Sequence, residues 1–217
     1  MDACIQMTAE NSKERRPRPR IEGLSDLVFG LSLSLASISL IVSPPNSPSE
    51  VNNHILAFVF AFILLITAWI NYTSSMSVLP LETRTVTVLN VIMLMSVALV
   101  PFLLNVIELP NLSLTPVENL VIRDYASMLF AVNLAALMAV LGLFSHILAK
   151  EEAKLIAPDL VARYRTSRNL TLMLAGFMLL TAAPIFGTYM ILGYPIRLYV
   201  WYAPIIVYWI RRLARPV

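Results

Sequence analysis

The sequence predicts an all-α fold: a polytopic membrane protein with six transmembrane helices. Of its 217 residues, 58% are hydrophobic and 13% are charged, whereas an ordinary soluble domain has about 25% charged residues. The charges fall in short clusters between long apolar segments, and nearly all Lys and Arg lie at one set of segment ends. These observations exclude an ordinary water-soluble surface and indicate that lipid surrounds most of the chain.

Six apolar segments follow a basic leader. A helix needs about 20 mostly apolar residues to cross about 30 Å of hydrocarbon. The segments that meet this standard are 21–42, 54–78, 86–108, 121–149, 169–192 and 195–212. Separators rich in proline or containing glycine end several of them, and the sixth segment begins at Pro195 and contains Pro204. We therefore assign 1–19 to a disordered, cytoplasmic basic leader and 20–217 to a single six-helix transmembrane domain.

The distribution of basic residues predicts the orientation of the helices. Fourteen of the 16 Lys and Arg residues lie in the leader up to Arg20, the 79–85 turn, the 150–168 loop and the C-terminal tail. The loops at 43–53 and 109–120 contain no Lys or Arg. Because basic residues concentrate on the cytoplasmic side of a membrane, both termini are expected in the cytoplasm. The net charge of +3 thus reflects topology, and no nucleic-acid partner is predicted.

An ionisable residue, Asp26, lies about one turn inside the first apolar segment. Intramembrane carboxylates usually face a bundle interior or a water-filled cavity and find partners there. Arg20, six residues earlier on the same helix, and the hydroxyl of Ser25 are the nearest candidates. The alternative is that Ser25 and Asp26 only cap a helix that begins at Leu27.

Two stripes of residues at helical spacing run along the first helix. At 100° per residue, five apolar positions lie within about 40° of one line, and Ser34 lies just beside it. These positions are Leu27, Leu31, Leu35, Ile38 and Val42. Ser25, Ser32 and Ser39 form a second stripe, whose small side chains favour close packing against another helix. The apolar stripe is left to face lipid, protein core or a pore.

The start of the first helix resembles the transmembrane protein 175 family of potassium channels. The residues Arg20-x-x-x-Leu24-Ser25-Asp26 are similar to the Arg-x-x-x-Phe-Ser-Asp signature of that family, and the likeness continues to Leu31. Weaker points of likeness are Trp69, Asn90 and the Pro101-Phe102 pair. The sequence departs from the pattern where Leu24 replaces the family Phe and where Asn71-Tyr72 stands in place of the His of many relatives.

The resemblance implies a homotetramer in which four first helices surround a central pore. Leu31, Leu35 and Ile38 would then form stacked apolar rings, with Leu31 as the main hydrophobic gate. Ser34 would bias the channel toward potassium over sodium, and Arg20, Ser25 and Asp26 would form a structural network that does not touch the ion. The permeant potassium ion is the only small-molecule species implied, and no cofactor is expected. A single-repeat chain implies a prokaryotic plasma membrane.

Other functions are predicted less strongly by the residues. A proton-coupled secondary transporter that uses Asp26 is the main alternative, and a structural scaffold is another. No metal-ligand pair or catalytic constellation is evident, so neither an enzyme nor a metal site is predicted. At the outer end of the fourth helix, Arg123 and Asp124 are expected to pair with each other or with Glu118.

Overall fold

The computed structural model describes residues 20–42, 47–77, 83–108, 115–151, 158–191 and 194–213. The leader predicted at 1–19 lies outside the described residues. Within them the chain is almost entirely helical, which confirms the all-α fold class. The exception is a pairing of two-residue strands, β1 (Met190–Ile191) and β2 (Tyr194–Pro195), which run antiparallel.

Five long helices form the body of the protein. They are α2 (Arg20–Val42), α3 (Pro48–Met76), α4 (Arg84–Glu108), α5 (Pro116–Glu151) and α6 (Pro158–Thr181). The first four coincide with predicted segments, extended at several ends by polar turns. Two of these helices begin with local capping. Ser47 accepts a hydrogen bond from the Glu50 amide (3.3 Å), and Thr115 and Glu118 bond each other's amides at 3.3 Å and 2.9 Å in a capping box.

The C-terminal part differs from the prediction. The fifth helix was predicted over 169–192, but α6 already begins at Pro158 and ends at Thr181, so residues 158–168 of the predicted loop are helical. The chain then forms the short α7 (Ile185–Thr188), β1 and β2. Pro184 explains the early end, since proline lacks the amide proton that a helix needs and disfavours helical geometry at the preceding residue.

The predicted sixth helix is also divided. It consists of α8 (Ile196–Val200) and α9 (Tyr202–Leu213), which are separated at Trp201. Pro204 cannot donate the hydrogen bond that a continuous helix would direct to the carbonyl of Val200. The predicted boundary of this segment is therefore nearly correct. Its helix is interrupted by a single turn residue, Trp201, whose backbone stays in the right-handed helical region.

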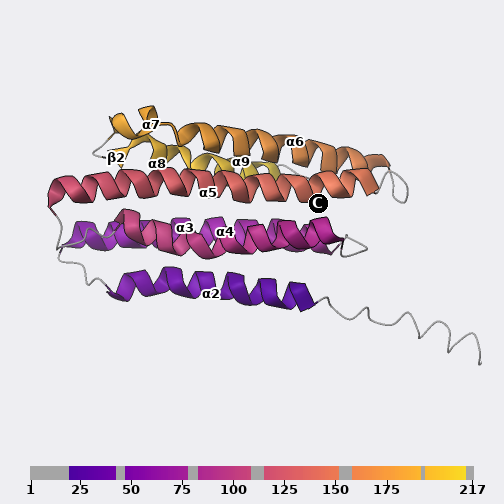
Figure 1. Ribbon diagram of the computed structural model, residues 1–217, viewed down its shortest axis with the longest axis horizontal. Helices are drawn as coiled ribbons and strands as arrows, with labels where there is room; N and C mark the ends of the chain where they lie inside the picture. The colour runs from indigo at the N-terminus through magenta and orange to yellow at the C-terminus, as the bar shows by residue number, and fades with distance from the viewer. Residues whose placement is uncertain are drawn as a thin grey trace, which may run out of the picture.

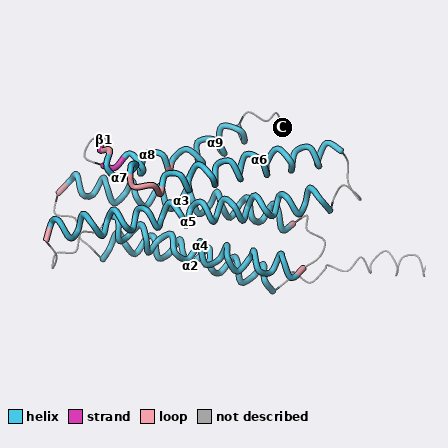
Figure 2. Tube along the Cα trace, turned by 45° about the horizontal axis from the view of Figure 1, so that its top comes forward, coloured by secondary structure: helices cyan, strands magenta, loops and turns pink. Residues whose placement is uncertain are grey.

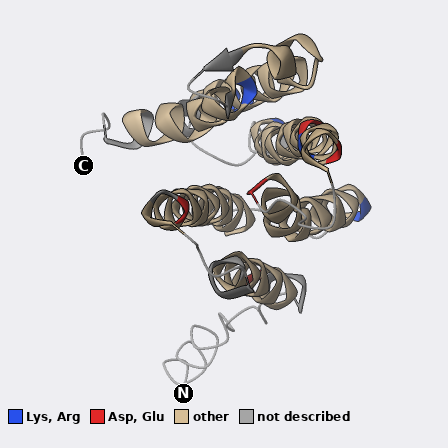
Figure 3. Cartoon of the chain, turned by 90° about the vertical axis from the view of Figure 1, so that its left-hand side faces the viewer, with Lys and Arg blue, Asp and Glu red and all other residues tan. Residues whose placement is uncertain are grey.

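The long helices lie side by side along the long axis of the molecule (Figures 1 and 2). In Figure 1, α2 lies at one edge, α3 and α4 form the next layer, α5 follows, and α6 with α7, α8 and α9 lies at the opposite edge. The core forms mainly where α3, α4 and α5 meet. Its fully buried side chains include Leu64, Leu65, Met93, Val97, Phe130 and Leu137. Viewed along the bundle, only a few described turns carry charge (Figure 3).

Three of the described helices are long and apolar enough to cross a membrane: Glu50–Met76, Arg84–Glu108 and Pro116–Lys150. Shorter apolar helical segments occur at Gly23–Ile38 and Ile196–Ile210. Together they describe a multi-pass membrane protein. The count of six spans and the cytoplasmic position of both ends stay predictions.

Candidate functional site: the exposed face of helix α2

Helix α2 exposes the apolar stripe that the sequence predicted as a candidate pore face. The exposed fractions are 71% for Leu27, 61% for Leu31, 44% for Leu35 and 46% for Ile38, and Ser34 is exposed beside them. These values describe one chain by itself, in which α2 lies at the edge of the bundle (Figure 1). The helix thus presents a continuous row of leucine and isoleucine side chains that the other described helices leave exposed.

The opposite face of α2 is packed against α3 and α4. Ser25 and Ser32 have exposed fractions of 0% and 1%, while Phe29 and Ala36 are similarly buried. Small serine side chains allow the neighbouring helices to approach closely. The prediction that the serine stripe is a packing face is confirmed for these two serines, whereas the side chain of Ser39 lies outside the described residues.

Two hydrogen bonds attach the start of α2 to α3. The indole Nε1 of Trp69 donates to Oδ1 of Asp26 at 2.9 Å, and the hydroxyls of Ser25 and Tyr72 are 2.8 Å apart. The rings of Phe29 and Tyr72 also lie in contact, with 6.2 Å between their centroids. Trp69 and Tyr72 are three residues apart and therefore lie on one face of α3. This face fixes both the position and the rotation of α2.

The alternative role of Ser25 and Asp26 as caps of a helix beginning at Leu27 is wrong. Helix α2 begins at Arg20, so both residues lie within the helix, where their side chains bond another helix. The predicted partner of Asp26, the side chain of Arg20, lies outside the described residues. Sequence reasoning noted Trp69 only as a point of likeness and missed Tyr72 as a partner of Ser25. The usable signal was that two aromatic donors occur three residues apart near the C-terminal end of the second helix.

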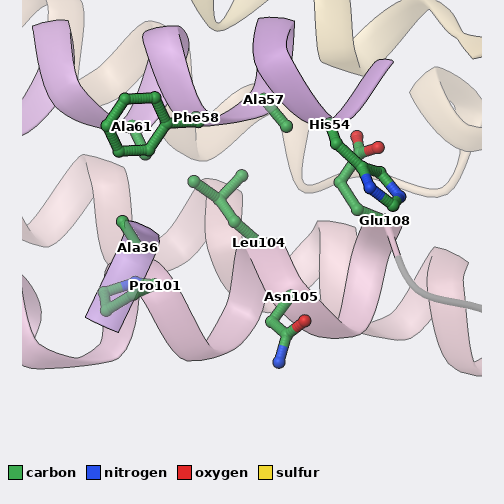
Figure 4. A pocket seen from close by; sticks show the side chains of 9 residues that line it. All are labelled: Ala36, His54, Ala57, Phe58, Ala61, Pro101, Leu104, Asn105 and Glu108. Carbon is green, nitrogen blue, oxygen red and sulfur yellow. The ribbon is translucent and has the colours of Figure 1, made fainter. Parts of the chain in front are cut away.

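A small cavity of about 20 Å³ lies near the opposite end of α2, between α2, α3 and α4 (Figure 4). Its lining includes Ala36 and Pro101, with His54 and Glu108 at one end, where α3 begins and α4 ends. This volume accommodates about one water molecule. The cavity is therefore too small for a ligand site but places polar groups behind the exposed stripe.

A buried arginine ties together the C-terminal segments. Arg197 of α8 has an exposed fraction of 0%. Its guanidinium donates to the Ser127 hydroxyl at 2.7 Å and to the carbonyl and carboxylate oxygens of Asp124 at 3.2 Å and 3.4 Å. It also donates to the carbonyl of Ala183 at 3.1 Å. The bonds hold α8 against α5 and against the turn that follows α6.

This arrangement corrects the ion pair that was predicted near the start of α5. Asp124 pairs with Arg197 instead of with Arg123, and Glu118 bonds Thr115 in the capping box. Consecutive residues on a helix point about 100° apart, so Arg123 and Asp124 face different neighbours. A partner 73 residues away in sequence became available only when α8 packed against α5.

Gly187 provides a test of this buried network. A β-carbon at Gly187 would overlap the Asp124 carboxylate and lie 3.1 Å from the Arg197 guanidinium. We expect Gly187→Ala to lower the free energy of unfolding by about 1–3 kcal/mol, the usual effect of overpacking. Gly176→Ala is the matched control, because a β-carbon there meets nothing within 4 Å and alanine favours helix. Thermal unfolding in detergent measures both, and equal stability of the two variants would contradict the expected clash.

A family model and two solved structures are similar to this chain. The family model described as the endosomal/lysosomal potassium channel TMEM175 matches residues 20–101, which contain α2, α3 and most of α4. No curated protein matches the chain. Among solved structures, a homologue of the lysosomal potassium-selective channel TMEM175 from Chamaesiphon minutus is similar, with a TM-score of 0.58 and 18% identity. This similarity covers 88% of the present chain and 96% of the other.

A second similar structure is a variant of the potassium channel MtTMEM175, in complex with a nanobody–MBP fusion protein. It has a TM-score of 0.60 and 17% identity, and the similarity covers 93% of the present chain and 95% of that chain. At such identities the structures establish a shared fold, while the family model adds the sequence match in the first helices. The resemblance predicted from the first helix is therefore confirmed: the chain matches the TMEM175 potassium-channel family over residues 20–101 and shares the fold of two solved TMEM175 channels.

Proposed function

We propose that the chain is one subunit of a homotetrameric channel that passes potassium in preference to sodium through a pore lined by four copies of α2. The exposed row on α2 is the observation that carries this proposal. One side of the helix is fixed to α3 and α4. The other side presents Leu31, Ser34, Leu35 and Ile38, which the other described helices leave exposed. The match of residues 20–101 to a potassium-channel family supports the same function. A prokaryotic plasma membrane is the proposed location.

Hydrophobic dewetting provides the proposed gate. In a fourfold assembly, each residue of the row would contribute four side chains to one ring around the pore axis. A narrow ring of leucines excludes water, and a hydrocarbon surface cannot replace the hydration shell of an ion. Leu31 is the principal gate residue, and Leu35 and Ile38 extend the apolar section. Conduction requires the α2 helices to separate or rotate until water enters.

Ser34 supplies oxygen to the proposed ion path. Its hydroxyl donates its proton to the Gly30 carbonyl at 3.0 Å. The lone pairs of the same oxygen are thereby available to a cation. Oxygen lone pairs are the groups that replace the water ligands of potassium in selective channels. Four such hydroxyls in one ring would favour the more easily dehydrated potassium ion over sodium.

The test is ion flux through proteoliposomes that contain the purified protein, with potassium and sodium gradients compared in the absence of a proton gradient. A channel gives rapid flux that increases with ion concentration and a reversal potential that follows potassium. Flux that saturates and depends on a proton gradient would instead identify a proton-coupled transporter using Asp26. A tetrameric protein without flux under any gradient would identify a scaffold and reject the proposed conduction.

The Ser34→Ala variant tests the source of selectivity. We expect the potassium-to-sodium permeability ratio to decrease about threefold to tenfold, the range that corresponds to the net value of one lost hydrogen-bonding interaction. Ser37→Ala is the matched control, because the Ser37 hydroxyl donates to the Ser34 carbonyl (2.7 Å) and its position lies off the exposed row. Bi-ionic reversal potentials measure both ratios. An unchanged ratio in Ser34→Ala would assign selectivity to another residue.

A further inference from the structure

A second and much larger cavity lies inside the subunit, between α3, α5, α6 and α9. Its volume is about 460 Å³, which falls within the range of about 300–1,000 Å³ typical of small-molecule sites. In Figure 1, α5, α6 and α9 lie on the far side of the bundle from α2. The cavity shares no described lining residue with the exposed row of α2, so its role is separate from the proposed pore.

One wall of this cavity is a polar face of α3. Thr67, Asn71 and Ser75 follow each other at intervals of four residues, so they lie on one side of the helix. The Asn71 amide donates to the Thr67 carbonyl, and the Ser75 hydroxyl donates to the Asn71 carbonyl, both at 2.9 Å. Because these donors are directed to the helix backbone, the side-chain oxygens keep lone pairs that can accept hydrogen bonds from another molecule.

The facing helices repeat this pattern. The Ser145 hydroxyl of α5 donates to the Leu141 carbonyl at 3.2 Å, and the Thr171 hydroxyl of α6 donates to the Ser167 carbonyl at 2.8 Å. None of the described lining residues carries a charge. The polar walls thus present neutral acceptor oxygens from three helices.

The hydroxyl of Thr67 indicates that the site is incomplete without a ligand. Thr67 has an exposed fraction of 4%, and its Oγ1 has no hydrogen-bond partner among the described residues. Buried polar groups in proteins are normally hydrogen-bonded, so each exception requires an explanation. Threonine in a helix uses two side-chain rotamers, which allows this hydroxyl to turn toward a bound molecule.

Much of the remaining lining is apolar, and Ser74, Ser167, Tyr164 and Tyr208 also belong to it. Leu64, Leu141, Leu174 and Ile205 come from the four helices that surround the cavity. A bare cation does not fit such a site, since an ion needs a close cage of oxygen atoms on all sides. A ligand that matches both the polar wall and the apolar wall of the cavity has hydroxyl donors at one end and an alkyl chain at the other.

We propose that this cavity binds an uncharged amphiphile, with a glycerol or sugar head against Thr67, Asn71 and Ser75 and a single alkyl chain against the leucine side chains. The hydroxyls of the head donate to the acceptor oxygens, and one of them satisfies the Thr67 hydroxyl. An anionic or cationic head binds more weakly, because a charge buried without a charged partner is unfavourable.

The proposal is tested by binding to the full chain in phosphatidylcholine nanodiscs, which contain no alkyl glycoside detergent. The probe is 1-monooctanoylglycerol, and octanoate is the comparison with the same chain and a charged head. We expect monooctanoylglycerol to raise the thermal unfolding midpoint in a saturable manner and octanoate to have a smaller effect. Midpoint shifts of equal size for both compounds, or a larger shift with octanoate, would overturn the proposal.

Three variants locate the site. Asn71→Leu and Thr67→Val are expected to weaken monooctanoylglycerol binding about threefold to tenfold, the effect of one lost hydrogen bond. The control is Asn119→Leu. The Asn119 amide makes the same kind of bond, donating to the carbonyl of Thr115 four residues earlier at 3.3 Å. Asn119 is not among the residues that line the cavity. Thr67→Val removes an unpartnered hydroxyl and therefore should not destabilise the free protein. Equal affinities of all variants and the wild type would show partition into the bilayer and reject the site. These measurements do not depend on ion flux.

Discussion

The Leu31→Ala variant is expected to conduct potassium about tenfold or more faster than the wild type under conditions in which the wild-type channel is closed. Leu31 is 61% exposed at the centre of the α2 row, so its side chain is available to form a ring with its symmetry copies. Shortening four leucines at one level widens the apolar constriction and lets water enter it. A barrier lowered by only about 1.4 kcal/mol gives a tenfold increase in rate.

Potassium efflux from proteoliposomes measures this effect directly. The matched control is Leu180→Ala, since Leu180 is 65% exposed. It belongs to α6, and this helix lies at the opposite edge of the bundle from α2 (Figure 1). If both variants behave like the wild type, Leu31 is not at the gate. If Leu180→Ala alone leaks, the pore lies along α6 and the proposed assembly is wrong.

The second large effect is expected for Asp26→Ala, which should reduce the fraction of assembled tetramer and leave the ion selectivity of the remaining channels unchanged. Asp26 accepts the Trp69 indole proton at 2.9 Å, and this bond fixes the rotation of α2. Loss of a charge-assisted bond that is partly exposed destabilises the docked helix by about 1–2 kcal/mol in each subunit. A tetramer contains four such contacts, so the loss is repeated four times.

Size-exclusion chromatography with light scattering gives the tetramer fraction, and reversal potentials give the selectivity. Trp69→Phe removes the donor while keeping the ring, so it should reproduce the assembly defect. Asp26→Asn retains an oxygen acceptor and should have a smaller effect. Correctly assembled Asp26→Ala tetramers with an altered ion preference would refute the positioning role and would place Asp26 in the ion path.

The membrane character and the first four helices could be predicted because they depend on local properties of the sequence. Apolar length, proline-containing separators and capping residues such as Ser47 and Thr115 act within a few residues of the element that they define. The two faces of α2 were also predictable, since leucines and serines at helical spacing separate by geometry alone. The structure places Leu31 and Leu35 on the exposed side and Ser25 and Ser32 on the buried side.

The C-terminal third was predicted less well, for a physical reason. The segments 169–192 and 195–212 are apolar throughout, and hydropathy does not distinguish one continuous helix from a broken one. Pro184 and Pro204 divide these segments, while the buried Arg197 holds the resulting pieces together. The carbonyl of Ala183, just after the end of α6, accepts hydrogen bonds from the Phe186 amide and from Arg197, and these bonds stabilise the broken geometry.

The sequence by itself determined that this is an α-helical membrane protein whose first helix carries a buried serine face and an exposed leucine face. These properties follow from composition and from the 3.6-residue period of the helix. The tertiary structure alone decided which groups meet: Trp69 with Asp26, Tyr72 with Ser25, Arg197 with Asp124, and the polar walls of the cavity between α3, α5, α6 and α9. Each of these contacts joins residues on different helices. Helix packing determines the distances between such residues, and no local pattern in the sequence specifies them.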